Sequence, residues 1–178
     1  MLMKNVDSKE QEAQIICTSC GLCCDGTLFT HANLIPEDSD ENLNAAGILA
    51  VQSSEKRYFQ LPCHHLENRR CKIYHMWRPH VCGRFRCKIL QRLSTGELSF
   101  EQGMEIAKKA REHIAELEHK INDTDVPDKM SIHDRFKALE SRQNVKDMSV
   151  ILNYAALLFR LNRDFIKKKK DSIGHSDK

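Results

Sequence analysis

Eight cysteines, arranged in two groups, are the residues of this chain with the clearest capacity for chemistry. The full set is Cys17, Cys20, Cys23, Cys24, Cys63, Cys71, Cys82 and Cys87. The rest of the 178-residue chain contains no cysteine. In a reducing compartment, clustered thiols are metal ligands or redox groups more often than structural disulfides. All eight are therefore candidate metal ligands, enough for two four-thiolate centres or for one centre with four spare thiols.

The spacing of the first group limits the kind of centre it can build. Cys17, Cys20 and Cys23 are separated by two residues each. Zinc modules normally contribute two C-x-x-C pairs per site, whereas three cysteines in a row at this spacing are commoner around an iron–sulfur cube. Cys24 follows Cys23 directly, and adjacent side chains generally point away from each other. The pattern predicts a 4Fe–4S cluster or Zn²⁺, in one or two centres, with Cys23 and Cys24 in different centres.

The second group is mixed with polar residues that could assist a centre. Cys82 and Cys87 are five residues apart, which places them on different faces of a helix, so we expect Gly83 to interrupt the helix between them. With eight thiols available, the nearby histidines are expected outside the coordination sphere: His64, His65, His75 and His80. If the chain is an enzyme, the first polar groups to test are His64, His65, Tyr74 and Arg78.

Charge is distributed unevenly although the net charge is only +3. Residues 56–92 carry ten Lys or Arg and one acidic residue, whereas residues 1–55 carry two basic and nine acidic residues. The positive charge therefore coincides with the second cysteine group. A four-thiolate site holding Zn²⁺ or a 4Fe–4S cluster has a net charge of about −2, which neighbouring cations would offset. A nucleic-acid-binding face is the alternative explanation.

Several separated segments around the cysteines resemble one known family. They are Cys17-x-x-Cys20-Gly21-x-Cys23-Cys24, Leu61-Pro62-Cys63, Cys71-Lys72-Ile73-Tyr74, Arg78-Pro79-His80-Val81-Cys82 and Phe85-Arg86-Cys87. With all eight cysteines in order, residues 17–87 resemble the bacterial YkgJ-like CxxCxxCC family, described as a zinc- or iron-chelating domain. That family usually has glycine in a G-x-C-x-I-Y element before the Cys71 position, where this chain has Arg69-Arg70. Relatives with such a cluster include flagellin lysine N-methylases, and this resemblance implies an iron–sulfur centre but not a methylase activity.

The remaining pattern predicts short elements followed by long helices. We expect helices over residues 1–16, 36–46 and 85–93, strands over 27–31 and 57–61, and ligand-held irregular chain over 63–87. Ser99 and Gln102 form a capping box. Behind it, apolar residues at helical spacing predict one long helix: Met104, Ala107, Ala110, Ile114, Leu117 and Ile121.

Two more helices are predicted after a loop at 122–129. Ser131 with Asp134 caps a short helix, and Asn144 with Asp147 caps the last one. We expect this last helix to bury one apolar face, which consists of Met148, Ile151, Leu152, Ala155, Leu158, Phe159 and Phe165. The predicted fold class is mainly α, with a small irregular α+β module nucleated by metal and a C-terminal helical hairpin or bundle.

The domain prediction is a cysteine-cluster metal-binding module over 1–96, a helical extension packed on it over 97–170, and a disordered tail over 171–178. No apolar run approaches the roughly 18 residues needed to span a bilayer, and residues 1–14 lack the apolar stretch of a secretory signal. The protein is therefore expected to be cytoplasmic, without a membrane partner. Nucleic acid is not favoured, and a homo-oligomer could form through the C-terminal helices if one apolar stripe stayed exposed.

Three functions fit these observations. The first is a metal-binding cysteine-cluster protein with a redox or accessory role, in which iron–sulfur is preferred over zinc. The second is a metal-dependent enzyme acting on a small substrate at an open metal position. The third is a zinc-stabilised interaction module that binds a protein or RNA through its basic face. An open coordination position favours the enzyme, and closed four-thiolate sites favour the module.

Overall fold

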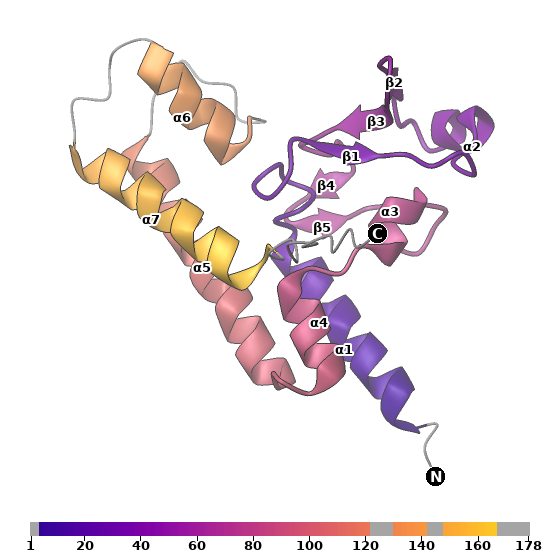
Figure 1. Cartoon of the computed structure of the whole chain (residues 1–178), viewed down its shortest axis with the longest axis horizontal. Helices are drawn as coiled ribbons and strands as arrows, with labels where there is room; N and C mark the ends of the chain where they lie inside the picture. The colour runs from indigo at the N-terminus through magenta and orange to yellow at the C-terminus, as the bar shows by residue number, and fades with distance from the viewer. Residues whose placement is uncertain (1–3, 122–129, 142–147, 167–178) are drawn as a thin grey trace, which may run out of the picture.

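The computed structural model describes residues 4–121, 130–141 and 148–166, and these residues are mainly helical (Figure 1). The described helices are α1 Lys4–Cys20, α2 Asp40–Ala45, α3 His80–Arg84, α4 Lys88–Thr95, α5 Phe100–Lys120, α6 Ile132–Ser141 and α7 Met148–Asp164. The predicted fold class, mainly α with a small irregular β component, is confirmed. Among the described residues, no helix combines the length and the apolar character needed to cross a membrane.

Two small antiparallel sheets provide the β component. The strands are β1 His31–Asn33, β2 Val51–Gln52, β3 Arg57–Gln60, β4 Leu66–Glu67 and β5 Arg70–Cys71. The first sheet has the order β1-β3-β2, with His31 opposite Gln60 and Val51 opposite Tyr58. The second sheet is the β4–β5 hairpin. In Figure 1 both sheets lie with α2 and α3 on one side of the molecule, and the long helices occupy the other.

Two hydrophobic cores support this arrangement. The larger core joins α1 to α4, α5, α6 and α7, and Ile16 and Leu117 are among its fully buried members. The smaller core lies around the three-stranded sheet and consists of Leu34, Leu43, Ile48 and Phe59. The first cysteine group follows directly after Ile16, so the larger core holds the segment that begins the candidate metal site.

Local signals place several helix ends where the sequence predicts them. The capping box at α5 is present, since the Gln102 backbone N–H donates to Ser99 Oγ and the Ser99 N–H donates to Gln102 Oε1. The Asp134 N–H likewise donates to Ser131 Oγ at the start of α6. Helix α4 ends at Thr95 and is capped by Gly96, whose φ of +79° is the left-handed conformation that favours glycine. The predicted cap at Asn144 and Asp147, the loop at 122–129 and the tail lie outside the described residues.

Several predicted boundaries were wrong near the cysteines. Helix α1 continues to Cys20 instead of ending at residue 16. The first strand begins at His31, because Thr27 belongs to a turn in which its N–H donates to Asp25 Oδ1. Helix α2 begins after Ser39, which caps it, rather than at Pro36. In each case a local side-chain hydrogen bond or tertiary packing outweighed the propensity of the flanking residues.

The prediction that Gly83 interrupts the chain between Cys82 and Cys87 was also wrong. Gly83 lies inside α3, and the interruption comes at Phe85, whose ψ of 129° is extended. Helix α4 then begins after Cys87 rather than at Phe85. The two cysteines still belong to different helices, but an extended segment separates them.

The predicted buried face of α7 was wrong as well. Of its residues only Phe165 is buried, whereas Met148, Leu152 and Phe159 are more than 60% exposed. The side of α7 that packs against the other helices contains Val150, Leu157 and Leu161. This helix carries apolar residues on two sides, so periodicity alone could not decide which side faces the core.

Substitution of two neighbouring leucines tests this orientation. Leu157 is fully buried and Leu158 is 41% exposed. We expect Leu157→Ala to lower the free energy of unfolding by about 2–5 kcal/mol, because it leaves a cavity in the core. Leu158→Ala should lower it by less than about 1 kcal/mol, as measured by urea denaturation. The reverse order would contradict the packing of α7.

Candidate metal centre

The last turn of α1 provides the first two thiols. Cys17 and Cys20 are three residues apart in α1 and therefore project from the same side of the helix. Helix α1 ends where Gly21 adopts a φ of +64° and its N–H donates to the Cys17 carbonyl. A Cβ atom on Gly21 would lie 3.0 Å from Arg111 Nη2 and 3.1 Å from the Arg69 carbonyl oxygen, so a larger residue would push these neighbours away.

The turn after Gly21 carries the cysteine doublet. The Cys24 N–H donates to the Gly21 carbonyl at 2.9 Å, which closes a tight turn around Cys23. The Cys24 carbonyl in turn accepts a 2.7 Å hydrogen bond from the Cys63 N–H. This bond joins the two cysteine groups through their backbones, between residues 39 positions apart in the chain.

The β4–β5 hairpin provides Cys71, which lies opposite Leu66. Asn68 and Arg69 form its turn with φ values of 48° and 66°. Arg69 therefore adopts a left-handed backbone conformation that favours glycine. Arg69 is therefore a strained residue at the edge of the site.

Helix α3 carries Cys82, and a buried carboxylate positions this helix. Asp38 is fully buried and accepts hydrogen bonds from the His80 N–H at 2.9 Å and from the Ile35 N–H at 3.0 Å. His80 Nδ1 lies 2.9 Å from the same Asp38 carboxylate. Burial raises the pKa of Asp38, but the hydrogen bonds from His80 and Ile35 outweigh it and the net pKa is lower than usual. Asp38 thus acts as an ionised anchor behind Cys82.

Cys87 is buried at the N-terminal end of α4 and belongs to the larger core. Together with the segments above, it brings thiols from α1, the Gly21 turn, the β4–β5 region, α3 and α4 into one part of the molecule. All eight cysteines are free thiols.

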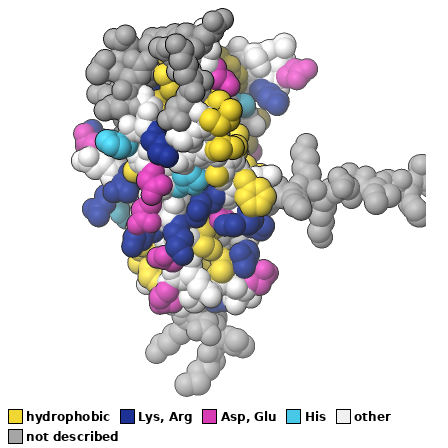
Figure 2. Space-filling model, turned by 90° about the vertical axis from the view of Figure 1, so that its left-hand side faces the viewer, with side chains coloured by type: hydrophobic (Ala, Val, Ile, Leu, Met, Phe, Trp, Pro, Cys, Tyr) yellow, Lys and Arg dark blue, Asp and Glu magenta, His cyan; other side chains and the backbone are white. Residues whose placement is uncertain are grey.

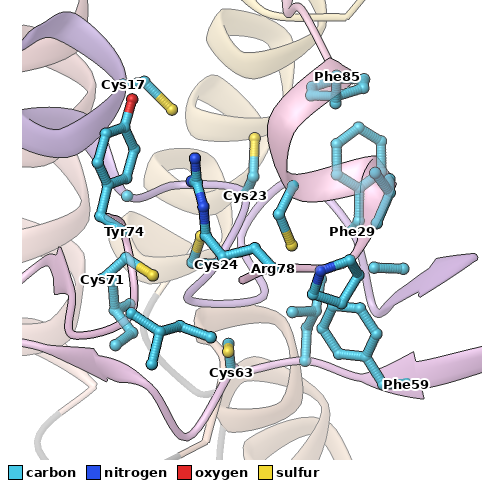
Figure 3. A pocket seen from close by; sticks show the side chains of 18 of the residues that line it. Cys17, Cys23, Cys24, Phe29, Phe59, Cys63, Cys71, Tyr74, Arg78 and Phe85 are labelled. Atoms are coloured by element: carbon cyan, nitrogen blue, oxygen red, sulfur yellow. The ribbon is translucent and has the colours of Figure 1, made fainter. Parts of the chain in front are cut away.

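A cavity of about 280 Å³ lies among these segments (Figure 3). Six thiols line it, namely Cys17, Cys23, Cys24, Cys63, Cys71 and Cys82. Its other side is apolar and includes Phe29, Phe59 and Phe85, of which Phe29 and Phe85 contact each other edge to face at 5.2 Å. Within the described residues, no three His, Cys, Asp or Glu side chains converge closely enough to hold one metal ion. The six thiols share the lining of this cavity with apolar side chains.

The charges that act on Cys23 and Cys24 show which sulfurs are neighbours. Burial raises the pKa of both thiols, and nearby thiolates raise it further. The thiolates acting on Cys23 are those of Cys20, Cys87, Cys24 and Cys17. Those acting on Cys24 are Cys17, Cys82, Cys63 and Cys71. Cys23 therefore lies near Cys17, Cys20 and Cys87, which together with it are called the α1 set. Cys24 lies near Cys63, Cys71 and Cys82, which together with it are called the sheet set. Cys17 is the thiol that acts most strongly on Cys24, so it borders both sets.

Three arginines supply positive charge to this region. Arg78 lowers the pKa of Cys17 and Cys82 against the effect of burial, and Arg86 does the same for Cys17. Arg111 acts in this way on Cys20, whose pKa burial nevertheless raises to about 12. Two of the three arginines come from the basic segment 56–92. This supports charge compensation of thiolates as the reason for the basic segment.

Arg111 also fastens the cysteine turn to α5. Its guanidinium donates from Nε to the Cys20 carbonyl and from Nη1 to Asp25 Oδ2, both at 2.5 Å. The side chain is 12% exposed, and its Nη2 has no hydrogen-bond partner. The sequence offered no signal for this residue, because Arg111 lies 24 positions beyond the last cysteine in a helix with many charges.

The polar residues named as candidates from sequence divide into two pairs. Tyr74 and Arg78 line the cavity, and the Arg78 guanidinium lies 4.1 Å above the centre of the Tyr74 ring. His64 and His65 do not line it. His65 Nε2 instead contacts the Ala46 carbonyl at 2.6 Å, and the two imidazole rings lie 3.8 Å apart. Tyr74 and Arg78 therefore lie at the thiols, whereas His65 contacts the end of α2.

Comparison with family models gives one match. Residues 16–105 match the CxxCxxCC family, described as "Putative zinc- or iron-chelating domain". The chain belongs to the CxxCxxCC family. This match confirms the resemblance expected from the cysteine segments, and it makes chelation of zinc or iron the family function. Comparison with curated proteins and with solved structures gave no match.

The chemistry of the donor set fits such an ion or cluster. Thiolates are ligands for zinc, for iron and for iron–sulfur clusters. The CxxCxxCC match ends at residue 105, so Arg111 lies in the part of the chain beyond it.

Metal binding should be strongly pH-dependent. Burial raises the pKa of Cys20 and Cys82 to about 12, so these thiols carry protons throughout the neutral range in the metal-free protein. Each thiol must lose its proton to bind, so Zn²⁺ should release about four protons per four-thiolate centre. The apparent affinity should then fall by up to about 10⁴-fold for each unit of pH decrease. Calorimetry in buffers of different ionisation enthalpy measures the number of protons released for each zinc ion bound. A release below about two protons per zinc would contradict thiol ligation.

Arg111→Met tests the fastening of the turn. Loss of the guanidinium leaves the Cys20 carbonyl without its side-chain partner and leaves Asp25 with only the hydrogen bond from the Thr27 N–H, so we expect a loss of about 2–3 kcal/mol in the free energy of unfolding. Lys108→Met on the same helix is the control, because Lys108 is exposed and should change stability by less than about 0.5 kcal/mol. Equal effects in urea denaturation would contradict the role of Arg111.

Proposed function

We propose that the protein holds an iron–sulfur cluster on its cysteines and has a redox or accessory role. The observation that carries this proposal is the placement of six thiols around one cavity of about 280 Å³. Six thiols are more than one four-thiolate zinc site needs. A cluster of several iron and sulfide atoms would occupy more of this cavity than a single ion.

The division of the thiols supports two centres. The α1 set contains the three cysteines spaced by two residues, which is the spacing suited to one face of an iron–sulfur cube. The sheet set contains Cys24, Cys63, the β5 residue Cys71 and the α3 residue Cys82. One set would hold a 4Fe–4S cluster, and the other would hold a second cluster or a zinc ion. In this proposal Cys23 and Cys24 serve different centres, as their adjacency predicts.

When bound, a cluster of this type supplies one-electron redox chemistry. The chain would contribute the positive charge of Arg78, Arg86 and Arg111, which offsets the charge of the thiolates and favours the reduced, more negative state. The apolar side of the cavity, including Phe59, would keep water from that face. The two other functions considered from the sequence, a metal-dependent enzyme and a zinc-stabilised interaction module, stay predictions.

Metal and acid-labile sulfide analysis of anaerobically purified protein tests the proposal. We expect about four irons and four sulfides per cluster, with broad visible absorbance that bleaches on reduction. A colourless protein that contains one or two zinc ions and no sulfide would overturn it.

Paired substitutions test the division into two centres. Cys20→Ser with Cys23→Ser should remove the metal of the α1 set and leave that of the sheet set, and Cys63→Ser with Cys71→Ser should do the opposite. Ser19→Ala, in the same helix turn as Cys20 and exposed, is the control and should keep all the metal. Complete loss in both double variants, with the protein still folded by circular dichroism, would indicate one shared centre.

A further inference from the structure

Helix α7 is apolar on two sides, yet the described residues cover only one of them. Val150, Leu157 and Leu161 pack into the larger core. At 100° per residue, a second apolar stripe lies on another side of the helix. This outer stripe consists of Met148, Ile151, Leu152, Ala155, Leu158 and Phe159. A helix with apolar residues on both sides is normally covered on both sides.

The outer stripe is long, continuous and uncharged. Met148 and Leu152 are 63% exposed and Phe159 is 69% exposed. From Met148 to Phe159 the stripe extends about 16 Å at 1.5 Å per residue. Figure 2 views the side of the molecule on which α7 lies, and hydrophobic side chains are exposed there among Lys and Arg side chains. Such a patch on a chain of this size marks an interaction surface.

The area and chemistry of the stripe favour an identical stripe as its partner. Its five large side chains present on the order of 500 Å², so a symmetric pair would bury about 1,000 Å², the lower bound for a specific interface. With no charge inside it, the stripe needs an uncharged, apolar and equally narrow surface opposite. Ala155 at its middle allows two helices to approach closely.

We propose that two copies of this protein associate through their outer stripes, with the two α7 helices antiparallel. A two-fold axis makes one patch serve both partners. A parallel pair would align the two helix dipoles in the same direction and would bring Arg163 and Asp164, which form an ion pair, against the same residues of the other copy. The antiparallel pair separates these residues from their copies by the length of the stripe and places opposite ends of the two helix dipoles together.

Sedimentation equilibrium of the metal-loaded full chain, at concentrations on the order of 10–100 µM, tests the association. We expect a mass near twice the 20.6 kDa of one chain. Phe159→Glu and Leu152→Glu should each return the mass to that of one chain. Leu49→Glu is the matched control, because Leu49 is an even more exposed apolar residue, at 81%, but lies outside α7. It should leave the dimer intact.

The proposal is overturned if the wild-type protein keeps the mass of one chain over this range, or if Phe159→Glu still dimerises. Metal content and helical content by circular dichroism are measured on every variant, so that loss of the fold is separated from loss of association. All these side chains are exposed, and both quantities should remain as in the wild type.

A charge-pair rescue tests the antiparallel arrangement. Met148 and Phe159 lie at opposite ends of the stripe, so each faces the other across an antiparallel pair centred on its middle. Met148→Glu combined with Phe159→Lys should associate more strongly than Met148→Glu combined with Phe159→Glu, since each Glu meets a Lys of the other copy. Met148→Glu combined with Phe159→Glu is the control and should stay monomeric. Absence of rescue would overturn this arrangement.

Discussion

The gathering of the cysteine thiols in one small region is the constraint on which the rest of this structure depends. A thiolate is stable there only when positive charge or metal compensates it, and without metal the thiols keep their protons because burial raises their pKa. The backbone bond from Cys63 to Cys24 and the arginines around the cavity are the means by which the chain brings the sulfurs together. Metal binding would then contribute directly to the stability of the fold.

The helical half is part of this arrangement. Arg111 reaches from α5 to the carbonyl of Cys20 and to Asp25, and a Cβ atom on Gly21 would lie only 3.0 Å from its guanidinium. The larger core continues from α1 into α4 and α5, so the helix that presents Cys17 and Cys20 has its apolar side against the C-terminal helices. The segment that matches the CxxCxxCC family is thus supported by residues beyond that match.

The same helical half presents the outer stripe on α7 away from its packed side. An association there would leave the cavity and its apolar wall free, because the stripe contributes none of the residues that line the cavity. A dimer would therefore carry two separate cysteine sites, one in each copy, and the function proposed for one site does not depend on the association.

The sequence by itself determined the eight candidate ligands, the family, the mainly helical class and the capped start of α5, because these depend on local spacing and side-chain chemistry. The tertiary structure decided which face of α7 is buried, since two apolar stripes satisfy helical periodicity equally well. It also decided the roles of Asp38 and Arg111, which act on Cys82 and Cys20 across more than 40 positions of sequence. A charged side chain in a polar segment has no local pattern that marks it. Only the folded chain brings it next to the group it stabilises.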